Sequence, residues 1–137
     1  MKTRVFAVAC LTGAFVCAAA AQPASHPQWV GVWESKLDGQ PGATLTLAQD
    51  TGELGGTLVL NIIMKDGAPS RVAASEPHVL VNPRVDGNTL FFGVRKIDGS
   101  GALLNFTVAL TPEGKARIHC VNCGNDAPIV DMERQWQ

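Results

Sequence analysis

From Trp29 onward the chain is a series of short apolar and β-branched runs separated by turn residues, and this alternation most constrains its fold. In several runs the apolar residues recur with a period of two, which is typical of strands that bury one face. The runs cover residues 29–37, 43–49, 54–63, 79–81, 89–96, 102–110, 115–121 and 128–134. The pattern predicts about eight strands, and no run of helical period competes with them.

The segments between these runs are mostly as short as hairpin turns. Glycine, aspartate, asparagine and proline mark turns near 38–42, 50–53, 83–88 and 111–114, and a longer loop is expected at 65–71. Parallel neighbours would need crossovers of about a dozen residues, and a Greek key would need a long return connection. The sequence therefore predicts an all-β domain, an up-and-down antiparallel barrel over residues 29–137.

Residues 1–21 have the layout of a secretory signal peptide. Lys2 and Arg4 precede an apolar run, and Ala19-Ala20-Ala21 forms a cleavage site of the A-x-A type. The apolar run is shorter than the ~20 residues of a membrane-spanning helix, so no membrane span is expected. We expect cleavage near Ala21, a secreted or periplasmic protein, and a flexible lead-in over residues 22–28.

The charge balance argues against nucleic-acid partners. The whole chain has 11 basic and 12 acidic side chains, a net charge of −1. Loss of residues 1–21 removes Lys2 and Arg4, so that 9 basic side chains face 12 acidic ones, a net charge of about −3. Nucleic-acid binding needs a basic face that neutralises phosphates, and this composition does not provide one.

The first and last predicted strands carry Gly31-Val32-Trp33 and Met132-Glu133-Arg134. A Gly-x-Trp on the first strand with an arginine on the last resembles the lipocalin family and the wider calycin superfamily of small barrels. The likeness is to short exported bacterial lipocalin-like domains and extends over residues 29–134. It implies that Arg134 packs across Trp33 and closes one end of the barrel, since a guanidinium stacks well on an indole.

The inward-facing apolar side chains are candidates for lining a cavity. A small barrel either fills its interior with its own side chains or holds one small ligand, and the sequence leaves both possibilities open. The first hypothesis is a carrier of a small apolar ligand. Its predicted lining is Trp33, Leu45, Leu47, Leu58, Leu60, Leu90, Phe92, Leu104, Phe106 and Val108.

The alternative is a non-catalytic interaction module with a packed core. Some predicted strands are apolar on their outer face as well, and such a surface favours contact with a second copy or a partner protein. The residues concerned are Val59, Ile63 and Phe91.

Cys120 and Cys123 are the two cysteines outside the predicted signal peptide. In an oxidising compartment such a pair is expected to form a disulfide. The alternative is a zinc site in which His119 joins both cysteines and His78 or Asp126 is the fourth ligand, although a structural site usually draws on two ligand pairs.

No catalytic constellation emerges from the sequence. The nucleophile motif Gly-x-Ser-x-Gly is missing, and the histidines at 26, 78 and 119 have no serine and aspartate partners in a recognisable order. Aspartates such as Asp38 and Asp86 mark turns, where their side chains bond to the backbone. We therefore expect neither an enzyme nor a cofactor.

Overall fold

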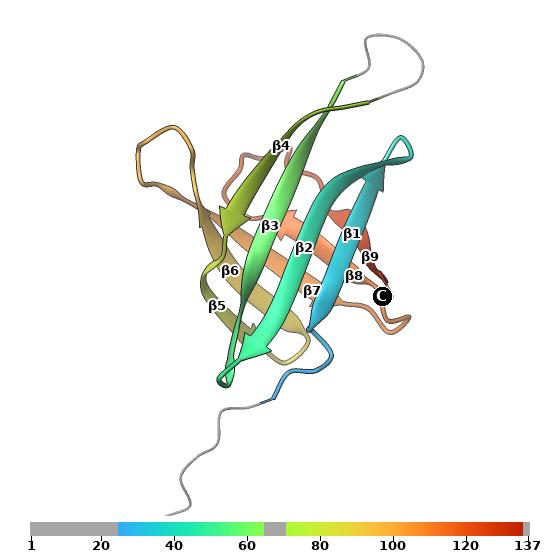
Figure 1. Cartoon of the computed structure of the whole chain (residues 1–137), viewed down its shortest axis with the longest axis vertical. Helices are drawn as coiled ribbons and strands as arrows, with labels where there is room; N and C mark the ends of the chain where they lie inside the picture. The colour runs from blue at the N-terminus through green and yellow to red at the C-terminus, as the bar shows by residue number, and fades with distance from the viewer. Residues whose placement is uncertain (1–24, 65–70, 136–137) are drawn as a thin grey trace, which may run out of the picture.

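The computed structural model describes residues 25–64 and 71–135. The predicted signal peptide, the start of the lead-in and most of the predicted loop at 65–71 lie outside the described residues. Within the described part the fold is all β, with nine strands and no helix (Figure 1). The strands are β1 (Gly31–Leu37), β2 (Gln40–Asp50), β3 (Glu53–Met64), β4 (Arg71–Val79), β5 (Val81–Asp86), β6 (Thr89–Arg95), β7 (Leu103–Leu110), β8 (Ala116–Cys120) and β9 (Val130–Gln135).

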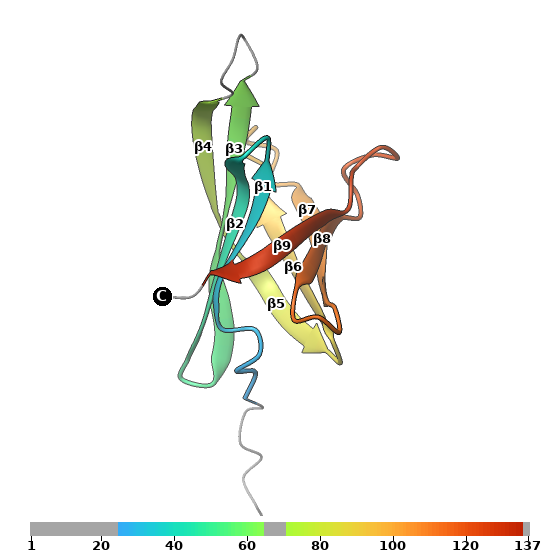
Figure 2. The same ribbon diagram turned by 90° about the vertical axis from the view of Figure 1, so that its right-hand side faces the viewer.

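All nine strands belong to one antiparallel sheet in the order β4-β3-β2-β1-β9-β8-β7-β6-β5. The first strand pairs with the second and also with the last, since Trp33 lies opposite both Leu45 and Arg134. This double pairing curls the sheet into two facing layers, β1–β4 and β5–β8, with β9 crossing between them (Figure 2). The layers diverge toward one end, and this divergence leaves room for a site.

The sheet differs from the expected closed barrel of about eight strands in strand count and in closure. It has nine strands, and β4 and β5 form its two edges, joined in sequence by Leu80 alone. The Leu80 N–H donates to the carbonyl of Gly56 on β3, at 3.1 Å. The sheet is therefore a curled half-barrel that is open between β4 and β5.

The strand β4 begins at the last residue of the loop predicted at 65–71 and covers residues for which no strand was predicted before residue 79, and β5 covers part of the turn predicted at 83–88. Most β4 side chains are exposed, so this strand lacks the apolar alternation that reveals a half-buried strand. Pro77 lies on β4, and Pro83, in the predicted turn at 83–88, lies on β5; edge strands tolerate proline because their outer N–H groups need no partner. Pairing with the neighbours β3 and β6 defines these strands instead.

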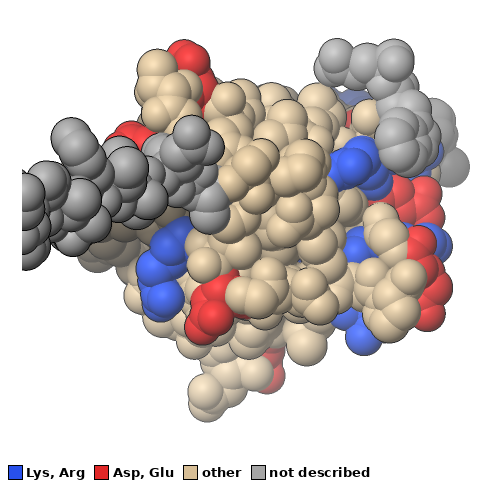
Figure 3. Space-filling view, turned by 90° about the horizontal axis from the view of Figure 1, so that it is seen from below, with Lys and Arg blue, Asp and Glu red and all other residues tan. Residues whose placement is uncertain are grey.

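The core fills the end of the sheet at which the N-terminal segment enters. Trp29 was expected in the first strand, but it lies before β1, fully buried across this end. The backbone N–H of His26 donates to Gln49 Oε1 at 2.9 Å, which ties the segment to β2. Seen from below, this end is covered mostly by uncharged residues, with separate acidic and basic side chains among them (Figure 3).

Candidate functional site

The predicted interior residues separate into a packed group and a group that lines a cavity. Leu60, Leu104 and Phe106 line a cavity of about 660 Å³ at the end where the layers diverge. The others are at most 4% exposed and belong to the packed core. They are Trp33, Leu45, Leu47, Leu58, Leu90, Phe92 and Val108. The two possibilities left open by the sequence, a filled interior and a cavity, therefore occur in different halves of one domain.

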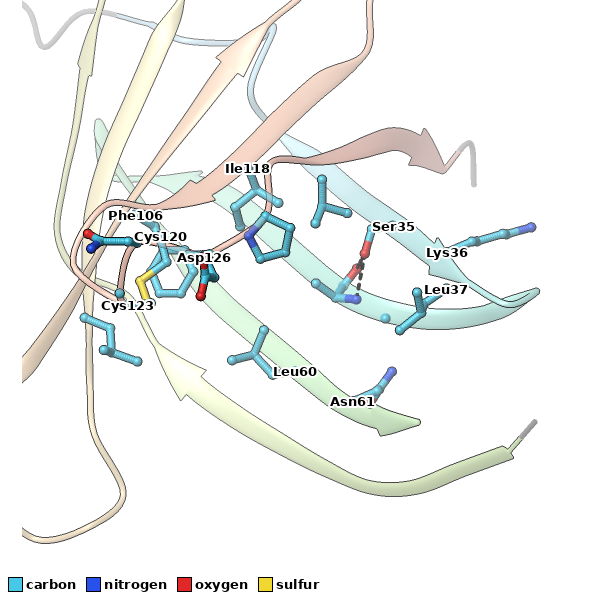
Figure 4. Close-up of a pocket in the computed structure, with 18 residues that line it drawn as sticks. Ser35, Lys36, Leu37, Leu60, Asn61, Phe106, Ile118, Cys120, Cys123 and Asp126 are labelled. Atoms are coloured by element: carbon cyan, nitrogen blue, oxygen red, sulfur yellow. Dashed lines mark hydrogen bonds between the residues drawn. A yellow bond between two sulfur atoms is a disulfide. The ribbon is translucent and has the colours of Figure 1, made fainter. Parts of the chain in front are cut away.

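The cavity lies between β1–β3 on one side and β7–β9 on the other (Figure 4). The segment 123–128, which connects β8 to β9, contributes six consecutive lining residues. Most of the wall is apolar. The larger apolar side chains are Leu37, Leu60, Leu104, Phe106, Ile118 and Val130.

The polar side chains of the β-strand wall have their hydrogen-bonding atoms engaged inside the protein. Ser35, 3% exposed at a bulge in β1, accepts a bond from the Ala43 N–H at 2.8 Å. The Asn61 side chain donates to the carbonyl of Pro41 at 2.8 Å and accepts from Ser75 at 2.6 Å. A molecule in the cavity therefore meets an apolar surface on this side.

Lys36 and Asp126 are the charged side chains of the lining, and they are placed differently. Figure 4 shows Lys36 directed away from the cavity, as expected for a residue between Ser35 and Leu37, while Asp126 lies beside the disulfide and toward the cavity. A hydrogen bond and the charge of Lys115 lower the pKa of Glu133 on β9, and Lys36 adds a smaller effect of the same sign. The Lys36 charge is thus directed at β9.

The disulfide between Cys120 and Cys123 forms part of the cavity wall, with the two Cα atoms 5.5 Å apart. Asn122, between them, accepts from the Asn105 N–H at 2.7 Å and donates to the Leu103 carbonyl at 2.9 Å. These bonds fix the start of the segment 123–128 against β7. The predicted pairing of the two cysteines is present.

The alternative zinc site does not assemble around these cysteines. Their sulfur atoms are bonded to each other and so are not thiolates. His78, one proposed fourth ligand, lies on β4 with its Nε2 atom 4.0 Å from Glu76. Among residues 25–64 and 71–135, no group of three or more histidine, cysteine, aspartate or glutamate side chains is placed to hold a metal ion.

At the packed end, Arg134 lies over Trp33, with its guanidinium carbon 4.7 Å from the ring centroid. The guanidinium donates to the Gln28 carbonyl, and Trp33 Nε1 donates to the Trp29 carbonyl at 3.0 Å. Gly31 has a φ of +132°, and a Cβ there would lie 3.7 Å from Arg134. The Gly-x-Trp and the terminal arginine thus meet and join β1, β9 and the N-terminal segment.

The outer apolar residues do not form the single patch expected from the sequence. Val59 and Ile63 lie on β3, whereas Phe91 lies on β6 in the opposite layer. All three are partly buried, and the Arg84 guanidinium covers the Phe91 ring at 4.4 Å. A homodimer or partner surface made of these three residues together is therefore not supported.

Sequence reasoning missed part of the cavity wall. Ile118 and Val130 carried a usable signal, because both occupy inward positions of apolar runs that had been predicted as strands. The sequence of the segment 123–128 gives no such signal, because turn residues do not indicate which surface they cover.

No family model matches the chain, and no curated protein and no solved structure matches it either. The resemblance to lipocalins therefore rests on residues of this chain, chiefly Gly31, Trp33 and Arg134. What the protein does must be argued from the cavity itself.

Proposed function

We propose that the protein is an exported, lipocalin-like carrier, not an enzyme, and that it binds a small apolar molecule in the cavity between β1–β3 and β7–β9. The observation that carries this proposal is the cavity of about 660 Å³ with its apolar walls. Small-molecule sites commonly measure roughly 300–1,000 Å³ and are lined by apolar side chains with few polar groups.

The state of the polar wall residues favours an apolar ligand over a polar one. Ser35 and Asn61 already exchange hydrogen bonds with Ala43, Pro41 and Ser75. A polar ligand would lose bonds to water without replacing them there, whereas an apolar ligand gains roughly 25 cal/mol for each Å² removed from water. The cost of removing a ligand from water therefore favours apolar ligands over polar ones in this cavity.

The inner row of β3 extends the apolar surface beyond the cavity. Ile62 and Met64 follow Leu60 on this row and are 47% and 41% exposed. Figure 1 shows β3 and β4 reaching past the other strands at this end. We propose that this exposed row guides an apolar chain into the cavity.

Export is the part of the proposal that rests on the cysteines and the predicted signal peptide. Disulfides persist in oxidising compartments, and the Cys120–Cys123 pair fits a secreted or periplasmic protein. In residues 25–64 and 71–135, no helix is long and apolar enough to cross a membrane.

Binding is tested with N-phenyl-1-naphthylamine, a neutral apolar dye that fluoresces in apolar sites. We expect saturable, one-to-one binding by the purified protein. Leu104→Trp fills the cavity and should weaken binding at least tenfold. The matched control is Asn105→Trp, the same large side chain at the next position of β7, whose side chain is exposed; its affinity should be unchanged. Equal loss in both variants, or no dye binding by the unaltered protein, would contradict the proposal.

A further inference from the structure

We infer that the cavity prefers apolar ligands with a positively charged head over ligands of equal length with a carboxylate head, and that Asp126 sets this preference. The inference rests on the proposed function and names the ligand class of the same site. The polar side chains of the β-strand walls are engaged in hydrogen bonds within the protein, so a charged ligand head would find its partner at the rim of the cavity.

Asp126 is the charged side chain placed to meet a ligand head. It is exposed, lines the cavity and lies toward it in Figure 4. No ion pair of Asp126 is found among the described residues, whereas Asp131 on β9 pairs with Arg117 and Glu133 pairs with Lys115. Its carboxylate is therefore available to a cation from outside.

Lys36, the other charged residue of the lining, does not offset this charge for a bound ligand. It alternates with Ser35 and Leu37 along β1 and is directed out of the cavity. The charge of Lys36 instead helps to lower the pKa of Glu133 on the neighbouring strand β9. A carboxylate head at the rim would thus meet Asp126 without a facing lysine.

The segment that carries Asp126 is anchored at its start and closed by a turn around Asp126. The disulfide and Asn122 anchor its start to β8 and β7, and the Ala127 N–H turns back to the Gly124 carbonyl at 3.4 Å. A carboxylate held at the rim of an apolar cavity attracts an opposite charge and repels a like one more strongly than it would in open water.

The test uses three competitors that carry the same dodecyl chain: dodecylammonium, dodecan-1-ol and tridecanoate. Each displaces N-phenyl-1-naphthylamine from the purified protein at neutral pH, below its micelle concentration. Equal chains make the apolar contribution equal, so differences report on the head. We expect dodecylammonium to bind about threefold or more tighter than tridecanoate at low salt, with the difference shrinking at about 1 M salt.

Asp126→Asn should bring the cation and the carboxylate close to equal affinity. The matched control is Asp86→Asn, which removes the same charge from an exposed position outside the cavity lining and should leave the preference unchanged. Equal or stronger binding of tridecanoate, or an unchanged preference in Asp126→Asn, overturns the inference while leaving the proposed function intact. If neither the dye nor any competitor binds, both are overturned. If a variant fails to fold, the ranking by the unaltered protein and its salt dependence still test the preference itself.

Discussion

The guanidinium of Arg134 lies 4.7 Å from the centroid of the Trp33 ring, and this contact joins the last strand to the first. Trp33 is only 2% exposed and bonds to the Trp29 carbonyl, so the same residue also fixes the N-terminal segment. The contact completes the packed end of the sheet and leaves the cavity at the other end.

Trp33→Ala should destabilise the protein by ~3–5 kcal/mol, because it removes a large, fully packed side chain and leaves a void. Urea unfolding followed by circular dichroism measures this loss. Arg134→Lys retains the charge but removes the planar stacking group, and should cost about 1 kcal/mol. A loss below ~1 kcal/mol for Trp33→Ala would show that this contact does not hold the packed end together.

The cysteine pair predicts a change in mass and a modest change in stability. The purified protein should be two hydrogens lighter than its reduced form, as mass spectrometry can show. The double variant Cys120→Ser, Cys123→Ser should lose stability near the low end of the ~2–4 kcal/mol typical of disulfides, because the closed loop is short. It should also bind the dye more weakly, since the segment 123–128 loses its anchor. Unchanged mass on reduction would refute the pairing.

Ser35→Ala should destabilise the protein by ~1–3 kcal/mol, since the Ala43 N–H would be left buried without its acceptor. Ser75→Ala is the matched control: this exposed serine also makes one short hydrogen bond, to Asn61, but water can replace it. Its loss should stay below ~0.5 kcal/mol. Equal effects of both variants in urea unfolding would contradict a special role for Ser35 at the β1 bulge.

The exposed pair of Lys115 and Glu133, with 2.9 Å between its charged atoms, predicts a small pH dependence. A hydrogen bond and the charge of Lys115 lower the pKa of Glu133, so its contribution to stability is present above the usual pKa of 4.5 and is lost as the pH falls through the lowered value. Lys115→Met should raise the pKa of Glu133 toward 4.5, as an NMR titration of its carboxyl carbon would show. A pKa unmoved by this substitution would mean that the pair does not form in solution.

The sequence was most informative where a strand buries one face. In β6 and β7, Leu90, Phe92, Phe106 and Val108 point inward as their period of two indicates, and Phe92 stacks on Phe106 with the ring centroids 5.5 Å apart. The strand β4 escaped detection because an exposed edge strand has no apolar face to produce a period. Its position is set by pairing with β3, which is a tertiary effect.

The candidate site was predictable only in part. Leu60, Leu104 and Phe106 were expected to face the interior, and they line the cavity. An inward side chain is packed in the core or lines the cavity depending on how far the two layers diverge and on the path of the segment 123–128. Local sequence patterns predict neither of these. The cavity therefore becomes visible only in three dimensions.

The central claim, that the cavity binds apolar molecules, is tested most directly by NMR during titration with N-phenyl-1-naphthylamine. The account predicts saturable shifts of backbone amides at Leu60, Leu104, Phe106 and residues 123–127, all of which line the cavity. The amides of Trp33 and Arg134 at the packed end should move little. Shifts confined to the packed end or to the outer faces of the sheet, or none that saturate, would contradict it.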